Sequence, residues 1–486
     1  MTAAALVVYL VLLGAAVFYV WRRPVRALYL FILGLPLHNI LMSLLYGGGV
    51  HGFALDLIQA WKEIVLATAL LAVGRTVLRR RQLPFDPGWI DILAIAYTAF
   101  VLLYALAPQS VLHGHASPKA VLYALRHDLV PVAAYFLGRS VWVDIRRLRW
   151  VIAGAAAVVA AWGLIEMYSV PIEWWRQSGA VGYFHRELGY DYHGPGGLPE
   201  NFAFNTSEGL FRRLVSTFVS PLATAYMLMV ALLLLAVTRR HQIWAAVLGS
   251  ICGLGLLFTF SRSTVLALTL GLVVLAVFRT RTWPLVASIA VAIFGLAFAS
   301  TFHHVAPRTH WFASDLPYQQ AQAKEKGPLP RSSSLKGTVS LREPSIRSHL
   351  DSLREGIKAV FRHPQGYGLG NAGTTAQRFD VRVRAGESNY TELGIETGLI
   401  GALVFIAWSI AILVGLVRPS LRGDRLAGAL AAAFTAVLAL AVQTDAIGVP
   451  WLAYCLWWLV GVLVVQAPRH IPHALKTRPR LQAVRD

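Results

Sequence analysis

Long hydrophobic runs alternate with short polar runs along almost the whole chain. A run of about 17–25 apolar residues is long enough for one helix to cross the hydrocarbon core of a bilayer. By that measure we predict 13 membrane-spanning helices, within a range of 12 to 14, and hence an all-α polytopic membrane protein. They cover residues 3–21, 27–45, 54–74, 88–107, 120–138, 150–168, 214–236, 243–260, 264–278, 284–301, 391–416, 426–446 and 449–466.

The composition agrees with a membrane protein. Of the 486 residues, 56% are hydrophobic and only 14% are charged, a balance that excludes a soluble enzyme. The formal net charge of +20 lies mostly in short runs between apolar segments, as the positive-inside tendency predicts, so we do not expect nucleic-acid binding. Cys252 and Cys455 both fall within apolar runs, which argues against a disulfide framework or a thiolate metal site.

The basic runs also predict the topology, because they mark the cytoplasmic ends of the spans. Two long polar segments then fall outside the cell. The resulting regions are N-terminal transmembrane helices (1–168), an extracytoplasmic loop (169–213), central transmembrane helices (214–301), a large extracytoplasmic loop domain (302–390), C-terminal transmembrane helices (391–466) and a basic cytoplasmic tail (467–486). Within the large loop, residues 345–362 have apolar residues at helical spacing and predict an amphipathic helix.

Residues 361–401 combine a glycine-rich polar loop with the start of an apolar helix. His363 precedes Pro364, and glycines at 366, 368 and 370 follow, so this part is not a helix interior. A loop with several arginines and Glu387 thus meets the membrane surface, where a water-soluble reactant would meet a lipid-linked one. No strand precedes the glycines and no helix follows immediately, which excludes a nucleotide-binding loop.

Arginines at the outer ends of predicted spans are candidate functional residues. Arg262 interrupts a long apolar stretch, and a guanidinium there is costly unless it faces a cavity or a partner; the alternative is an arginine that snorkels to the interface. Arg212 and Arg213 lie at the same boundary, where simple flanking charge is the alternative. Arg126 and Asp128, within one span, fit a structural ion pair.

Histidine pairs in the outside loops lack a third ligand at suitable spacing, so no metal site is predicted. These pairs are His113 with His115, His185 with His193, and His303 with His304.

Four motifs in order resemble one known family. The segment HPQGYGLGNAG (363–373) followed by ESNYTELGIETGLIG (387–401) resembles the O-antigen ligase and Wzy-type O-antigen or exopolysaccharide polymerase superfamily. Members of that superfamily show a His-Pro, Gly-x-Gly loop and then a helix ending in Glu-Thr-Gly-x-x-Gly. Upstream, RRLVSTFVSPLATAYML (212–228) resembles its Arg, Gly-Thr-Phe, Pro-Asn segment, and FTFSRSTVLAL (258–268) resembles its Ser-Arg helix turn. The resemblance covers residues 205 to 415.

Two departures from the family pattern affect the expected activity. Where ligases carry a His-Asn pair nine residues before the Glu of Glu-Thr-Gly, this chain has Glu387-Ser388. Ser220-Pro221-Leu222 replaces the Pro-Asn pair. The missing histidine favours a polymerase or an exopolysaccharide-type relative over a lipopolysaccharide ligase.

The resemblance implies a GT-C-like membrane glycosyltransferase of the bacterial cytoplasmic membrane, active on its outer face. The implied partners are an undecaprenyl-diphosphate-linked oligosaccharide donor, a glycan acceptor and the lipid bilayer, with no cofactor and no metal. The resemblance implies no particular oligomeric state. Displacement of the lipid diphosphate develops negative charge that guanidinium groups can stabilise without a metal. A carboxylate can accept the proton of the acceptor hydroxyl, and a single displacement inverts the anomeric carbon.

The candidate residues follow from this chemistry. We expect Arg213, Arg262 and Glu387 to be catalytic, and a second set to bind substrate: Arg212, Arg382, Arg384, His363, Gly366, Gly368 and Gly370. The alternatives are an O-antigen ligase that transfers polymer to a lipid acceptor, a small-anion transporter and an inactive scaffold. A transporter would show inverted repeats with broken midplane helices, which we do not detect, and Arg262 makes a scaffold less favoured.

The predicted topology can be tested by thiol labelling. A cysteine introduced near Ser333 should react with a membrane-impermeant reagent in whole cells whose outer barrier has been opened, because 302–390 is expected outside. A cysteine near Arg422 should stay unlabelled until the membrane is permeabilised. Equal labelling at both positions would refute the topology.

Overall fold

The structure of the chain is a computed structural model that describes residues 2–279, 282–326, 329, 331–333, 337, 343–382 and 387–464. The candidate Arg384 and the basic tail 467–486 lie outside these described residues.

Long apolar helices make up most of the described chain and confirm a helical multi-pass membrane protein. They are α1 (Thr2–Arg22), α2 (Val25–Gly47), α3 (Phe53–Gln59), α4 (Trp61–Arg80), α5 (Trp89–Leu106), α6 (Pro118–Ser140), α7 (Ile145–Ser169), α10 (Pro221–Ala236), α11 (Gln242–Phe258), α12 (Arg262–Arg279), α13 (Trp283–Val305), α18 (Asn389–Leu421), α19 (Arg425–Leu440) and α20 (Trp457–Leu463). Each of the 13 predicted spans coincides with one of these helices or with an adjoining pair.

Not all of these helices are long enough to span a bilayer alone. Among the described residues, seven are long and apolar enough, or eight if α3 and α4, which bend by 46°, form one span. Five shorter apolar helices account for the other predicted spans: α10, α11, α12, α19, and α20 with the turn η6 (Leu452–Leu456) that precedes it. The total of 12 to 14 spans therefore stays a prediction.

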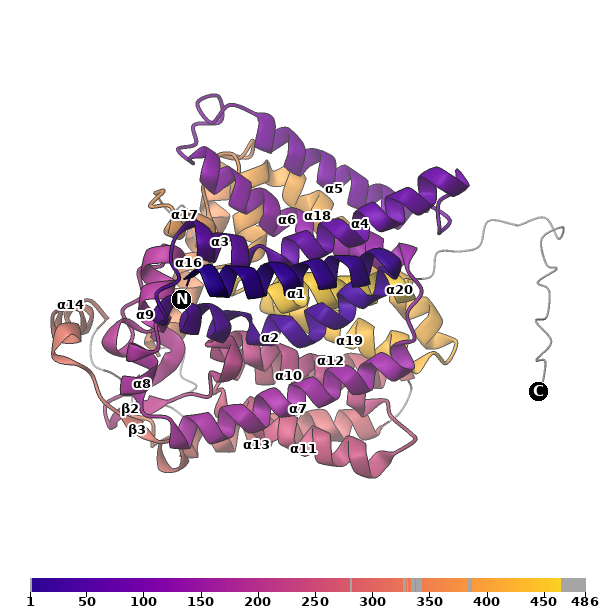
Figure 1. Cartoon of the computed structure of the whole chain (residues 1–486). Coiled ribbons are helices and arrows are strands. Elements are labelled where there is room, and N and C mark those ends of the chain that lie inside the picture. Colours follow the sequence, from indigo (N-terminus) through magenta and orange to yellow (C-terminus); the bar gives the residue numbers. More distant parts are fainter. Residues whose placement is uncertain are drawn as a thin grey trace.

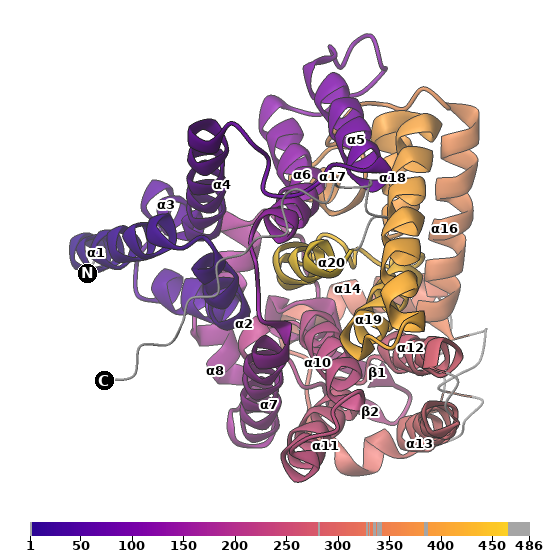
Figure 2. The same cartoon turned by 90° about the vertical axis from the view of Figure 1, so that its right-hand side faces the viewer.

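The helices lie roughly side by side, and the short elements gather at one end of the bundle (Figure 1). Viewed after a 90° turn, α20 lies in the middle, between α6, α18 and α19, which it contacts (Figure 2). Its Trp457 and Trp458 are fully buried. In contrast, α1 exposes large apolar side chains such as Val7 and Leu12. Since no water is available in hydrocarbon, such a surface fits contact with lipid.

The short elements at this end of the bundle bring the two predicted outside segments into contact. They are α8 (Ile172–Gln177), α9 (Ala180–Gly182), η1 (Tyr183–Glu187), η2 (Pro195–Gly197), η3 (Glu200–Phe202), β1 (Ala203–Thr206), β2 (Gly209–Arg212), η4 (Ser216–Phe218), β3 (Arg308–Thr309), η5 (Ala313–Asp315), α14 (Leu316–Lys326), α16 (Pro344–Arg362) and α17 (Gly373–Arg378). Helix α16 confirms the predicted amphipathic helix. The three strands form an antiparallel sheet in the order β1-β2-β3, which the sequence analysis did not predict.

The glycine loop (residues 363–373) packs against a break in α18. The helix is interrupted at Gly398, whose φ of 72° and ψ of 174° are not helical. The amide of Leu399 donates to the Pro364 carbonyl at 2.8 Å, and the amide of Tyr367 donates to the Ile395 carbonyl at 2.6 Å. A Cβ on Gly366, which has a φ of +78°, would lie 2.5 Å from the Gly398 nitrogen, so only glycine fits this close approach.

A buried ion pair joins the small sheet to α7. Arg212, at the end of β2, pairs with Glu166 of α7, and both side chains are almost fully buried. The Arg212 guanidinium also donates to the Val170 carbonyl, and Trp175 Nε1 donates to Glu166 Oε1 at 2.6 Å. Removal of one partner would leave the other charge buried and uncompensated.

We therefore expect Glu166→Ala to destabilise the protein by about 3–5 kcal/mol, since it leaves the Arg212 charge unpaired. Thermal unfolding in detergent should show a clear fall in Tm. Glu173→Ala is the matched control, because Glu173 makes a half-exposed pair with His310 that contributes about 0–1 kcal/mol. The double variant Glu166→Leu/Arg212→Met should recover most of the loss. Equal Tm values for the two alanine variants would contradict this account.

Candidate functional site

Among the described residues, the Arg213 guanidinium has no carboxylate partner. It follows β2, and its amide donates to the Phe202 carbonyl at 3.1 Å. Its Nε donates to the Thr259 carbonyl at 2.8 Å, and Nη2 lies 3.5 Å from the Phe260 carbonyl. Among the described residues, no carboxylate oxygen lies within 4.0 Å of this guanidinium. The side chain is partly buried, so its charge is compensated only by carbonyl dipoles.

A second guanidinium increases the positive potential at this point. Burial, together with the nearby charge of Arg262, lowers the pKa of Arg213 to about 9. Arg213 still carries its charge at neutral pH, but the free energy of that charge is raised relative to water. An anion bound between the two arginines would lower it again.

Arg262 is the first residue of α12, and its side chain lies near one carboxylate and two aromatic rings. Its Nη2 lies 3.4 Å from Glu343 Oε1, and the side chain is 22% exposed. Its guanidinium lies 5.5 Å from the ring centre of Phe204 and 5.6 Å from that of Phe260. Both rings attract the cation and limit its mobility. The predicted candidates Arg213 and Arg262 are thus brought together.

Glu387, the third predicted catalytic residue, pairs with a histidine that sequence reasoning missed. Glu343, the partner of Arg262, also caps α16, because its Oε2 accepts from the Ile346 amide at 3.0 Å. One turn further along α16, His349 Nδ1 contacts Glu387 Oε2, and both side chains are half-exposed. The hydrogen bond to Glu387, partly offset by burial, raises the pKa of His349 above its ordinary value of 6.5.

The structure does not bring the other described candidates to this group: Glu343 precedes α16, whereas His363 and the glycines follow its end. Arg212 is committed to the buried pair with Glu166. Arg382 is exposed. His363 stacks on Tyr367 at 4.1 Å between ring centres, and its Nε2 lies 3.3 Å from the Leu112 carbonyl. Gly366, Gly368 and Gly370 all have positive φ and contact α18 or the 108–116 loop. Their contacts fit a supporting role, and substrate binding by them stays a prediction.

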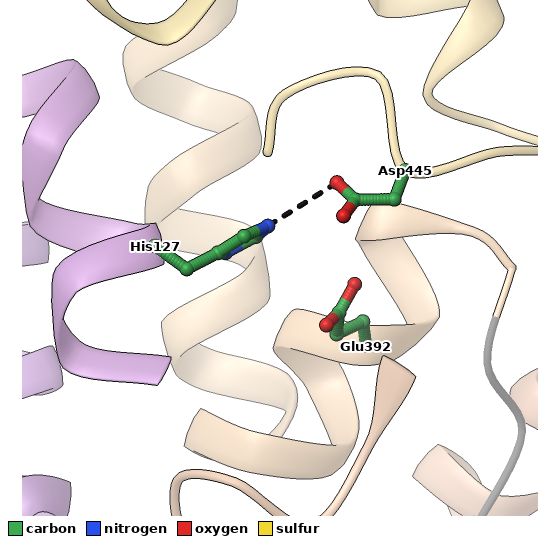
Figure 3. Close-up of side chains that lie close together, drawn as sticks. All are labelled: His127, Glu392 and Asp445. Atoms are coloured by element: carbon green, nitrogen blue, oxygen red, sulfur yellow. Dashed lines mark hydrogen bonds and ion pairs between the residues drawn. The ribbon is translucent and has the colours of Figure 1, made fainter. Parts of the chain in front are cut away.

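A partly buried cluster combines one histidine with two carboxylates. His127 of α6, Glu392 of α18 and Asp445, in the connection after α19, have ligand atoms within 4.8 Å of one another (Figure 3). His127 Nε2 lies 3.2 Å from Asp445 Oδ1, and His127 Nδ1 lies 2.9 Å from Asp128 Oδ1. Asp128 therefore pairs with His127. The ion pair predicted between Arg126 and Asp128 is wrong, because Arg126 pairs with Glu63 at 3.1 Å.

Tyr226 connects the arginines with the acidic cluster. Its hydroxyl lies 3.5 Å from Thr444 Oγ1, next to Asp445 in the chain. Both Arg213 and Asp445 are close enough for their charges to act on this hydroxyl. The arginines and the acidic cluster are therefore two ends of one polar region, a positive end and a negative end.

Comparison with known proteins adds no family assignment. No protein-family model matches the chain, and no curated protein matches it either.

Proposed function

We propose that the chain is a GT-C-like membrane glycosyltransferase that polymerises undecaprenyl-diphosphate-linked oligosaccharide units on the outer face of the bacterial cytoplasmic membrane. One observation carries the proposal. Arg213 is a partly buried guanidinium whose hydrogen-bond partners among the described residues are backbone carbonyls, with the charge of Arg262 nearby. This arrangement favours a doubly charged anion at the level where a helix bundle meets the membrane surface.

A lipid diphosphate has the chemistry that this position requires. Its phosphates are anionic, and its hydrocarbon tail stays in the bilayer while the sugar extends into water. Guanidinium groups form paired hydrogen bonds to phosphate oxygens. Because they are fixed before the reaction, they stabilise the charge that develops on the leaving oxygen at little reorganisation cost.

The proposed reaction is a single displacement. The acceptor hydroxyl oxygen forms a bond to the anomeric carbon of the donor, and the bond between that carbon and the phosphate oxygen breaks. The lipid diphosphate leaves with the electron pair, facing Arg213 and Arg262. The proton of the acceptor hydroxyl passes to the His349–Glu387 pair, and the configuration at the anomeric carbon inverts.

The His349–Glu387 pair suits the role of proton acceptor better than either group alone. The imidazole is a stronger base than a carboxylate, and its raised pKa increases that basicity. Glu387 fixes the ring through Nδ1, which leaves Nε2 to receive the proton. Both side chains are half-exposed, as contact with a water-soluble sugar requires.

Extracts of a deletion strain test the activity directly. Loss of a polymerase should leave single repeat units on the lipid carrier. Full-length polymer on the carrier would instead indicate a ligase that transfers polymer to a lipid acceptor. Normal glycan in the deletion strain, together with reduced anion uptake, would support a small-anion transporter and refute the proposal.

The two arginines give a second test. Lysine keeps the charge of arginine but loses the planar fork. We expect Arg213→Lys and Arg262→Lys each to lower polymerisation by about 100-fold or more, as for loss of one oxyanion donor. Protein abundance should be unchanged.

Arg308→Lys is the matched control for that experiment. Arg308 lies on β3 of the same small sheet and is exposed, so its lysine variant should be as active as the wild type. Wild-type polymer levels from both Arg213→Lys and Arg262→Lys would exclude a donor site at these residues.

The proton acceptor can be tested by pH dependence. His349 accepts a proton only when it is neutral, so activity should fall as the pH drops through its raised pKa, with a midpoint above 6.5. Glu387→Gln removes the negative charge that raises this pKa. The acidic limb of the rate profile should therefore move to lower pH and the maximal rate should fall.

His349→Gln should lower the rate by about 10²–10⁴-fold, the usual contribution of a general base. His193→Gln is the control, because His193 forms a similar pair with Asp191 in another segment. The pair is excluded as the base if two results are found together. The acidic limb of the pH–rate profile does not move in Glu387→Gln, and His349→Gln is fully active.

A further inference from the structure

We propose that His127, Glu392 and Asp445 form a binding site for one divalent transition-metal cation, of the Mn²⁺ or Zn²⁺ type. The proposal rests on the geometry of these three side chains and is independent of the proposed glycosyltransferase activity. Figure 3 shows the two carboxylates and the imidazole pointing toward a common point between α6, α18 and the connection after α19.

The distances suit a shared cation. Ligands bound at about 2.1 Å in tetrahedral geometry lie about 3.4 Å from each other. His127 Nε2 and Asp445 Oδ1 are 3.2 Å apart, close to that spacing. The Glu392 carboxylate completes a group whose ligand atoms all lie within 4.8 Å of one another. Rotation of the Glu392 side chain would bring its carboxylate oxygen to a similar spacing from the other two ligand atoms.

Glu392 lacks the partner that a buried carboxylate needs. The residue is 3% exposed, and its Oε2 is inaccessible and without a hydrogen bond among the described residues. A buried unpaired carboxylate is strongly unfavourable. Space around it is also preserved: Gly373 has a φ of +60°, and a Cβ there would clash with the Glu392 carboxylate. The carboxylate is thus kept clear of neighbouring side chains on that side.

Neighbouring groups orient the proposed ligands. Asp128 Oδ1 lies 2.9 Å from His127 Nδ1, so Asp128 can accept the proton on Nδ1 and leave Nε2 free for a metal. This carboxylate–histidine arrangement recurs behind metal ligands. Asp445 Oδ1 accepts from Asn389 Nδ2 at 2.8 Å and from the Gly448 amide at 2.8 Å, which leaves Asp445 Oδ2 with one longer contact, to Thr374 at 3.3 Å.

The number of carboxyl groups around His127 favours a bound divalent cation over a single proton on the imidazole. Asp128, Glu392, Glu396 and Asp445 bring four carboxyl groups into this region. Among the described residues their only ion-pair partner is His127. A protonated imidazole supplies one positive charge, whereas a divalent cation supplies two. One nitrogen and two carboxylate ligands without a thiolate match Mn²⁺ or Zn²⁺ better than Ca²⁺, which takes six to eight oxygens.

Metal binding to the purified full-length chain tests the proposal. Protein in detergent would be treated with a chelator, titrated with Mn²⁺ or Zn²⁺, and analysed for bound metal and for Tm. We expect one ion per chain and a rise in Tm, because a ligand that binds only the folded state stabilises it. Mg²⁺ and Ca²⁺ should have a much smaller effect.

Three variants locate the ion. Glu392→Gln keeps the shape of the side chain and removes a ligand, so it should abolish the metal-dependent rise in Tm. Asp128→Asn changes only the group behind His127 and should weaken binding by about 10–100-fold. His193→Asn, which removes an exposed histidine next to Asp191, should bind like the wild type.

Two results would overturn the site. The first is wild-type protein that binds neither metal, which would mean that protons alone balance the carboxylates. The second is unchanged binding in Glu392→Gln and Asp128→Asn, which would place the metal elsewhere. If Glu392→Gln does not fold, the wild-type titration and Asp128→Asn still decide the question. Because no step measures glycan, this result is separate from the test of the proposed function.

Discussion

The organisation of the end of the bundle that carries the small sheet depends on one constraint: a charge removed from water needs a partner or an opening to water. Two adjacent arginines meet the constraint differently. Arg212 pairs with Glu166, whereas the Arg213 side chain has, among the described residues, the carbonyls of Thr259 and Phe260 as its hydrogen-bond partners. The first arrangement stabilises the fold. The second leaves a positive charge whose best partner is an anion from outside the chain.

The same constraint separates the positive and the negative end of the polar region. Tyr226 lies between them, within reach of the charges of Arg213 and Asp445, and no ion pair joins the two ends among the described residues. If the arginines paired directly with the carboxylates, neither would be available to bind an ion from outside the chain. With the two ends held apart by a neutral hydroxyl, the arginines stay available to an anion and the carboxylates to a cation. In the proposed reaction, the donor diphosphate would occupy the positive end.

The hydrophobic pattern predicted the helices well, because a bilayer fixes their length and polarity. It did not predict what depends on contacts between distant segments. In the sheet β1-β2-β3, residues 203–206 pair with 209–212, and residues 210–211 pair with 308–309. That sheet separates Arg212 from Arg213, since neighbouring residues of an extended chain point to opposite sides. Glu387 pairs with His349, 38 positions earlier, and His127 meets Asp445 across 318 positions. Periodicity carries no signal for such pairs.

The motifs that resemble a known family have a structural consequence in this chain. The amide of Gly370 donates to Glu396 Oε1 at 2.8 Å, and the glycine loop closes on the break of α18 at Gly398. Glu392 lies one turn before Glu396 and hence on the same side of α18. The loop thus holds the side chain of Glu396 and the bend at Gly398, and Gly373 leaves room for the Glu392 carboxylate. The contacts of the glycines and of the Glu-Thr-Gly turn thus fit a support, and the side chains proposed to do chemistry lie elsewhere, on α12 and α16 and next to α18.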